Sequence, residues 1–362
     1  MHTGLTNYFW KKSNALIVNI RCLHRRQDWA NPFSPSRWCD PLGDQSVFMM
    51  LTPPETSDSN TQPSDPKKKD QKEYPENSII LVSARLDQMG MFDNTQVGSE
   101  SPATGIVTLL SVIKLLSDHQ RPETKLAYRN GVENVLFAFL NGESYDYIGS
   151  SKMVYDMGNS EFPCVSSSGN ATSCKRAKDK VKEMVEGKRW PSILPKSIRN
   201  YLEVGQVYSR DKKGSDQDLY IHVDSSTGSD TLVGDLKASF RKAEGLRVAT
   251  ASDAARELPP SSVRKFLGLT APKKTPSALL TNFDQSMTNK YYHSLYDDYV
   301  DAKVYDPKAD ETQDLVVKIS RVAESVASHV FYQVWPLTRL ILALLSSVYS
   351  DANSCEKSNR IC

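Results

Sequence analysis

The sequence has no marked excess of charge of either sign, and its few cysteines form no paired motif. Its 362 residues include 45 lysines and arginines against 43 aspartates and glutamates, which gives a formal net charge of +2. Such a balance does not indicate nucleic-acid binding, so no nucleic-acid partner is expected. The six cysteines contain no Cys-x-x-Cys pair. Their even number suits an oxidising compartment.

The two ends of the sequence also lack long apolar runs. Residues 1–20 contain a basic pair but no continuous apolar core leading to small residues, as a signal peptide would. The apolar stretch at 340–345 follows Pro336 and Arg339 and is far shorter than the roughly 20 residues that cross a bilayer. We therefore expect neither a signal peptide nor a transmembrane helix within this sequence.

Composition divides the sequence into one long region with regular apolar patterns and several polar segments. The predicted parts are a small N-terminal portion at 1–51, a disordered loop at 52–76, a main domain at 77–333 with a polar insert at 159–198, and a C-terminal tail at 334–362. The loop is predicted because Pro, Ser, Asp and Lys dominate it and apolar residues are almost missing. Within the N-terminal portion, short strands are expected at 15–20 and 47–51.

The main domain alternates strand-like and helix-like patterns. Apolar or alternating runs predict strands at 78–84, 135–140, 201–208, 219–223, 246–250 and 278–282. The helix predicted at 106–116 is apolar nearly all round, so we expect it to be buried against the sheet. A last amphipathic helix is predicted at 311–333, with an apolar face of Leu315, Ile319, Val322, Val326 and Val330. The alternation predicts an α/β fold with a mostly parallel sheet covered by helices on both faces.

One of these strands leads directly to a candidate functional residue. The apolar run at 135–140 ends in Asn141-Gly142, a turn sequence, and the carboxylate of Glu143 follows at once. Ligands of open α/β sheets bind outside the carboxyl ends of the strands. Glu143 is therefore expected in a site, although an ordinary strand and turn would also account for this pattern.

The segment from Gly142 to Ser150 resembles a motif of zinc aminopeptidases of the transferrin-receptor and glutamate-carboxypeptidase type. Gly142, Glu143, Gly149 and Ser150 match it, whereas Ser144 replaces the second glutamate, which binds zinc in those enzymes. Keeping the general base and losing this ligand is typical of the nicastrin family, whose members are large non-catalytic subunits of γ-secretase. The Asp-Tyr-Ile-Gly-Ser element at 146–150 is similar to that family as well.

The resemblance also identifies the five positions that would hold the zinc pair. Arg85, Ser101 and Ser144 occupy three of them, and Arg cannot ligate a cation. Glu203 and His293 keep residues that could bind metal, and His293 is interpreted as a hydrogen-bonded structural residue. Arg85-Leu86-Asp87 matches the His-x-Asp of those enzymes, with Arg85 in place of the His. Another His-x-Asp, with His222 followed by Asp224, lies in the wrong order and is interpreted as a solvated strand end.

The resemblance implies a zinc-aminopeptidase-like three-layer fold without a cofactor. It further implies the lumenal or extracellular ectodomain of a single-pass membrane protein, of which this sequence would be a fragment. Presenilin, the other γ-secretase subunits and type I membrane-protein substrates are the implied partners, in protein processing that includes Notch signalling. The residues implied for substrate recognition or assembly are Glu143, Asp146, Tyr147 and Arg85.

Three functions remain open at this point: a non-catalytic recognition subunit, an active zinc aminopeptidase, and a purely structural ectodomain. Glu143 is expected to pair either with Arg85, which would favour a structural role, or with a substrate ammonium group. The first alternative is preferred, because Arg85 replaces a positively charged metal.

Modifications are predicted at a few further positions. Disulfides are expected between Cys22 and Cys39 and between Cys164 and Cys174, since each pair closes a short loop. Asn170 begins an Asn-Ala-Thr glycosylation sequon.

Overall fold

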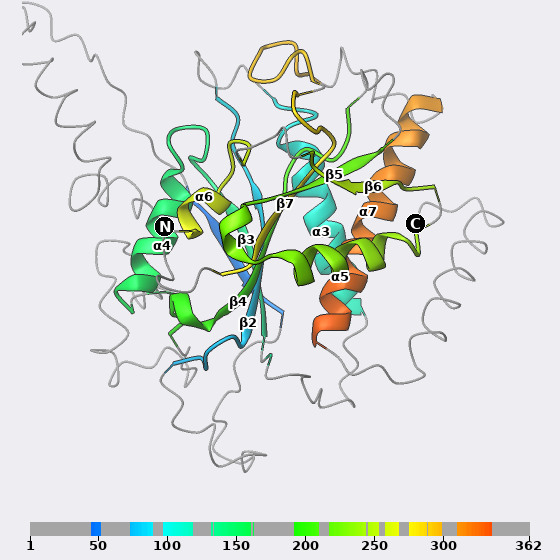
Figure 1. The fold of residues 1–362 in the computed structure, drawn as a ribbon. Helices are drawn as coiled ribbons and strands as arrows, with labels where there is room; N and C mark the ends of the chain where they lie inside the picture. Colours follow the sequence, from blue (N-terminus) through cyan, green and yellow to red (C-terminus); the bar gives the residue numbers. More distant parts are fainter. Residues whose placement is uncertain are drawn as a thin grey trace, which may run out of the picture.

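A computed structural model gives the fold of the chain (Figure 1). It describes residues 45–51, 73–89, 97–118, 132, 134–160, 162, 192–209, 217–243, 245–252, 258–267, 275–287, 289–298 and 310–334. The strand predicted at 15–20, the four cysteines of the predicted disulfides and the Asn170 sequon lie outside these residues. Of the loop predicted at 52–76, only residues 73–76 are described. There Glu73 forms a β-bridge with Ser192, and Tyr74 is buried.

The centre of the domain is a seven-stranded sheet with the order β1-β3-β2-β4-β7-β5-β6. The strands are β1 (Val47–Met50), β2 (Ile79–Arg85), β3 (Asn134–Leu140), β4 (Ile198–Val204), β5 (Leu219–Val223), β6 (Val248–Thr250) and β7 (Ser277–Thr281). The four adjacent strands β3, β2, β4 and β7 run parallel, whereas β1 is antiparallel to β3 and β5 is antiparallel to β7. The predicted mostly parallel sheet is thus confirmed.

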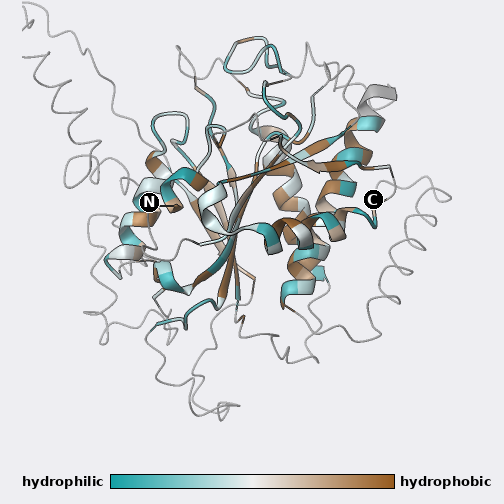
Figure 2. Ribbon diagram, in the orientation of Figure 1, coloured by the Kyte–Doolittle hydropathy of each residue, from teal (hydrophilic) through white to brown (hydrophobic). Residues whose placement is uncertain are grey.

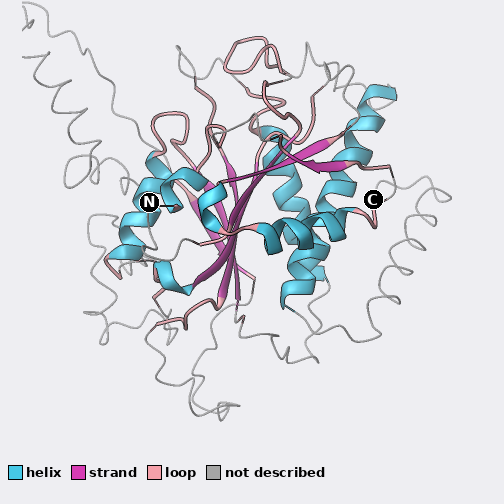
Figure 3. Ribbon diagram, viewed as in Figure 1, coloured by secondary structure: helices cyan, strands magenta, loops and turns pink. Residues whose placement is uncertain are grey.

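Helices cover both faces of this sheet (Figures 1 and 3). They are α3 (Ala103–Asp118), α4 (Ile148–Gly158), α5 (Asp230–Phe240), α6 (Val263–Phe266) and α7 (Asp310–Val334), with short 3-10 helices η3 (Pro195–Ser197) and η4 (Ser225–Thr227). Helices α4 and α6 lie on one face, and α3, α5 and α7 lie on the other. Each face has its own hydrophobic cluster. None of the helices that the structure describes is long and apolar enough to cross a bilayer.

The central strands are apolar along their whole length because both of their faces are covered. All residues of β3 are buried, and so are all residues of β2 except its last, Arg85. Such strands lack the alternation of half-exposed sheets, since every side chain packs against a helical layer. Figure 2 shows the apolar residues gathered in the sheet and on the inner sides of the helices.

Two predicted helices form, but the burial predicted for the first is wrong. Helix α3 spans the predicted 106–116, yet Val107 and Leu110 are 46% and 52% exposed. An outer layer leaves one face of each helix toward solvent, even where the residues there are apolar. Helix α7 follows its predicted pattern more closely, since Ile319, Val322 and Val326 are buried.

Candidate functional site

The candidate site lies at the carboxyl ends of three adjacent strands. Strand β2 pairs with β3 on one side and with β4 on the other, and all three run parallel. Arg85 is the last residue of β2, Glu143 follows β3 by three residues, and Glu203 lies near the end of β4. The topology therefore brings together three of the positions that the sequence analysis singled out.

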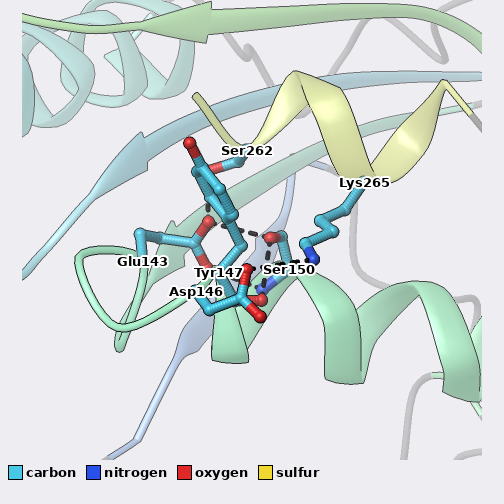
Figure 4. A network of polar contacts seen from close by, with 6 residues as sticks. All are labelled: Glu143, Asp146, Tyr147, Ser150, Ser262 and Lys265. Atoms are coloured by element: carbon cyan, nitrogen blue, oxygen red, sulfur yellow. Dashed lines mark hydrogen bonds and ion pairs between the residues drawn. The ribbon is translucent and has the colours of Figure 1, made fainter. Parts of the chain in front are cut away.

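The carboxylate of Glu143 is buried and accepts three hydrogen bonds from within the chain (Figure 4). The amide N–H of Ser150 donates to Oε1 over 2.7 Å, and the Ser150 hydroxyl donates to Oε2 over 2.8 Å. The Ser262 hydroxyl donates to Oε2 over 2.6 Å. Burial is the main cause that raises the pKa of Glu143, and these hydrogen bonds oppose it. Both oxygens of the side chain are thus engaged by the protein itself.

The turn that carries Glu143 is fixed by Asp87. The two carboxylate oxygens of Asp87 accept the amide N–H groups of Glu143 and Ser144, each over 2.8 Å. The Ser144 hydroxyl donates to the Asp87 carbonyl over 3.3 Å. Gly142 is required here because its φ is +77° and a Cβ would lie 3.0 Å from the Cβ of Ile148.

Asp146 and Tyr147 complete the turn before α4. Both have left-handed backbones, with φ of 63° and 57°. The Lys265 ammonium lies 3.5 Å from an Asp146 carboxylate oxygen and 5.4 Å from the centre of the Tyr147 ring. The predicted recognition residues are thus adjacent to Glu143, and each contacts the segment that contains α6 (Figure 4).

Glu203 is the second buried carboxyl of the site. Its Oε2 accepts the amide N–H of Val263 over 3.1 Å, and the Ser262 hydroxyl lies 3.5 Å from its Oε1. Burial raises the pKa of Glu203 to about 7; the positive charge of Arg85 opposes this increase, and the neighbouring Glu143 adds to it.

The preferred pairing of Arg85 with Glu143 is wrong. Arg85 Nη1 donates to the Tyr292 hydroxyl over 3.0 Å, and its Nη2 approaches the carbonyl of Pro260 at 3.5 Å. The guanidinium also lies over the Tyr292 ring, 5.8 Å from its centre. The physical reason is that serine donors already satisfy Glu143, so the charge of Arg85 acts on Glu203 instead.

His293 and Ser101, the two remaining positions that the resemblance singled out, take part in hydrogen bonds that involve backbone amides. His293 Nδ1 accepts the amide N–H of Met89 over 2.9 Å, and burial is the main cause that lowers the pKa of His293. The amide N–H of Ser101 donates to the carboxylate of buried Asp297 over 3.4 Å. Within the described ranges, no group of three His, Cys, Asp or Glu side chains is arranged to hold a metal ion.

The interpretation of His222 as solvated is also wrong. This side chain is only 2% exposed, its Nε2 lies 2.8 Å from the Phe283 carbonyl, and its ring packs 5.6 Å from the Phe283 ring. Phe283, which follows β7, contacts both a nitrogen and the ring of His222 and so removes this side chain from solvent. Asp224 does terminate the strand, where it accepts the amide N–H of Ser226 over 2.8 Å.

Three site residues were missed by sequence reasoning: Asp87, Ser262 and Tyr292. Asp87 had a signal, since it is the aspartate that remains of the His-x-Asp pattern. Ser262 lies in a family-like stretch, Leu-Pro-Pro-Ser-Ser, but nothing in that stretch indicated which residue it would reach.

The sheet and the site together define an α/β domain with a mostly parallel sheet and a polar site at the carboxyl ends of its central strands. Two carboxyls lie at the ends of β3 and β4, on either side of β2, and both accept hydrogen bonds from the same chain. The chain belongs to the nicastrin family: residues 78–331 match the family model of the nicastrin large lobe.

Comparison with individual proteins agrees with this assignment. The chain is 28% identical to mouse nicastrin over 327 residues, which cover 87% of the chain and 38% of that relative. It is 27% identical to human nicastrin over 293 residues, 78% of the chain and 33% of the relative. The chain therefore spans well under half the length of these curated relatives.

A crystal structure of the gamma-secretase component nicastrin has the same fold. It matches with a TM-score of 0.56 at 21% identity, over 88% of this chain and 51% of that one. This match, together with the sheet topology, confirms the predicted fold class.

Proposed function

We propose that this chain is the large-lobe part of a non-catalytic γ-secretase subunit, in which Glu143 is an internal anchor rather than a substrate contact. The observation that carries this proposal is that both oxygens of the Glu143 carboxylate accept hydrogen bonds from Ser150 and Ser262. A buried carboxylate with three hydrogen bonds is stabilised without an external cation. Its removal would disturb the packing of α4 and α6 before it affected any ligand.

The aminopeptidase alternative is disfavoured by the chemistry of the former ligand positions. A glutamate acting as general base needs a metal-bound water to activate. Arg85 has no lone pair to offer a metal, and the Ser101 and Ser144 side chains are neutral hydroxyls. The two positions that keep a donor, Glu203 and His293, are hydrogen-bonded to the backbone of different segments.

The partners of the whole protein follow from family membership and belong to the same proposal. Presenilin and the other γ-secretase subunits would bind the full-length protein, and type I membrane proteins would be the screened substrates. The domain would lie on the lumenal or extracellular side of the membrane. The Asn-Ala-Thr sequon at 170 suits that location.

Two substitutions of Glu143 in the full-length protein test the anchor role. Glu143→Gln keeps an oxygen that can accept from Ser150, whereas Glu143→Ala removes every acceptor. We expect the Gln variant to co-purify with presenilin at close to the wild-type level and the Ala variant several-fold less. Equal co-purification of wild type and Ala variant would refute the proposal that Glu143 supports assembly.

A further inference from the structure

Helix α3 presents an apolar stripe to solvent on its outer side. Val107 and Leu110 are 46% and 52% exposed, and Ile106 and Ile113 beside them are only partly buried. These four positions share one face of the helix, because they are adjacent or lie three or four residues apart. Single exposed apolar residues are common, whereas a contiguous group of them marks an interaction surface. We call these four residues the α3 stripe.

The sequence contains a matching apolar stripe shortly after α7, around the run at 340–345. Its apolar residues follow the pattern i, i+3, i+4, i+7, i+8, i+11: Leu337, Leu340, Ile341, Leu344, Leu345 and Val348. This spacing is typical of the apolar face of an amphipathic helix, and Pro336 stands just before it, where a helix start accepts proline. Residues 337–348 lie outside the described ranges, so their binding surface is inferred from this pattern and from the end of α7.

The chain leaves α7 beside α3. The two helices pack against each other, and Val334, the last residue of α7, is buried in the same cluster as Val112 and Leu116 of α3. Figure 1 shows α3 and α7 ending on the same side of the domain. The apolar pattern begins three residues later, so it starts close to the end of α3.

The lengths of the two stripes also agree. As a helix, residues 337–348 would extend over about 18 Å, at about 1.5 Å per residue. Residues 106–117 of α3 are equally many and therefore equally long. A segment that starts at the end of α3 and runs antiparallel to it thus reaches the whole α3 stripe, with Leu344 opposite Leu110.

We propose that residues 337–348 bind antiparallel along α3 and bury the α3 stripe. Apolar surface leaves water on both sides of this contact, which favours it. Arg339 and Ser346 fall on the opposite side of the amphipathic pattern, so no charge is buried. Only residues 335 and 336 separate the segment from α7, which gives it a high effective concentration at the stripe. This face of the domain is then covered from within the chain, independently of the proposed function.

Hydrogen–deuterium exchange of the full-length protein, located by peptide mass spectrometry, tests the proposal. We expect the amides of residues 337–348 to be protected in wild type. Leu110→Glu puts a charge into the stripe at an exposed position and should speed their exchange about tenfold. Leu344→Lys should do the same from the other side of the contact. Combining the two variants should restore most of the protection, because the opposite charges would then face each other.

The segment provides a matched control, because Leu342 lies on the other side of the apolar pattern from Leu344. Leu342→Lys should therefore leave the exchange of residues 337–348 at the wild-type rate. Strand β3, which is buried throughout, monitors the fold of the domain and should exchange equally slowly in every variant.

Four results would overturn the proposal. They are rapid exchange of residues 337–348 in wild type, unchanged exchange in Leu110→Glu, equal effects of Leu342→Lys and Leu344→Lys, and an equal rise in the exchange of β3. Protection that falls on dilution would also contradict it, because the stripe would then bind a second copy of the chain. The readout requires no other γ-secretase subunit, so it is separate from the co-purification that tests the proposed function.

Discussion

At the scale of single residues, Glu143 is a buried carboxylate whose two oxygens both accept hydrogen bonds from the chain itself. The general-base role needs a metal-bound water, whereas the anchor role needs only donors of fixed geometry. The structure supplies these from Ser150, seven positions along the chain, and from Ser262, 119 positions along the chain. One side chain thereby joins the start of α4 to α6.

The first prediction concerns the stability that this anchor provides. Glu143→Ala should lower the free energy of unfolding by about 2–4 kcal/mol, because three donors lose their acceptor in a buried place. Glu143→Gln should cost about 1 kcal/mol, since its oxygen still accepts and the serine hydroxyls can rotate. Urea denaturation measures both. Asp146→Asn is the control, because that side chain is 74% exposed and Asn tolerates the left-handed backbone there. A loss with Glu143→Ala no larger than the control's would contradict the anchor role.

The second prediction concerns His329 on α7. Burial lowers the pKa of this side chain from 6.5 to about 4, although Asp235 nearby opposes the shift. As pH falls, His329 takes up a proton in the unfolded chain before it does so in the folded one, which favours unfolding. The folded state therefore has its full stability with respect to this group above pH 6.5. It is lost between about pH 6.5 and 4, up to about 3 kcal/mol.

Denaturation of His329→Gln and wild type across this pH range isolates the effect. The variant should lose less stability on acidification than wild type. If the stability of the two proteins changed with pH in the same way, burial would not lower the pKa of His329. The raised pKa of Glu203 works in the opposite direction, because its contribution is present at low pH and lost as pH rises toward about 7. The comparison must therefore be made between the two proteins, not within one profile.

At the scale of elements, the sequence predicts long strands and helices from their local patterns, but it does not predict contacts between residues far apart in the chain. Strands β2 and β3 could be predicted because burial on both faces leaves an uninterrupted apolar run. Helix α6 could not be predicted, because it has only four residues, too few to show a helical period of apolar residues. The partner of Arg85 also depends on a tyrosine 207 positions away, whose placement follows from the loop and not from any local pattern.

The third prediction concerns the loop at 289–298, which is tied to the turn before α3. The carboxylate of Asp297 accepts from the amide of Glu100 over 2.9 Å and from the side-chain amide of Asn289 over 3.1 Å. Asp297→Ala should lower the free energy of unfolding by about 2–3 kcal/mol, because these donors become unsatisfied. Thermal or urea denaturation measures it.

The adjacent Asp298 is the control for this loop. Its Oδ1 is buried without a hydrogen-bond partner in the described residues, so Asp298→Asn should change stability by less than about 0.5 kcal/mol. Equal losses for the two substitutions would show that the loop is not held by Asp297.

At the scale of the whole molecule, the chain combines a peptidase-like sheet with a site closed by its own groups. The fourth prediction is that the purified full-length protein contains no stoichiometric zinc and shows no aminopeptidase activity. The sequence resemblance assigns three of five zinc-ligand positions to Arg85, Ser101 and Ser144, which cannot replace imidazole and carboxylate. Elemental analysis and a chelator titration of peptidase activity check this. Stoichiometric zinc together with chelator-sensitive cleavage would contradict this prediction and support the aminopeptidase hypothesis.

The central claim is that Glu143 supports the structure of a non-catalytic subunit and does not bind the substrate's amino terminus. Cleavage of one membrane-protein substrate, with a free or an acetylated amino terminus, tests it most directly. Complexes containing wild type and Glu143→Gln should give the same ratio of the two cleavage rates. A preference for the free amine in wild type that disappears in Glu143→Gln, with assembly unchanged, would contradict the claim.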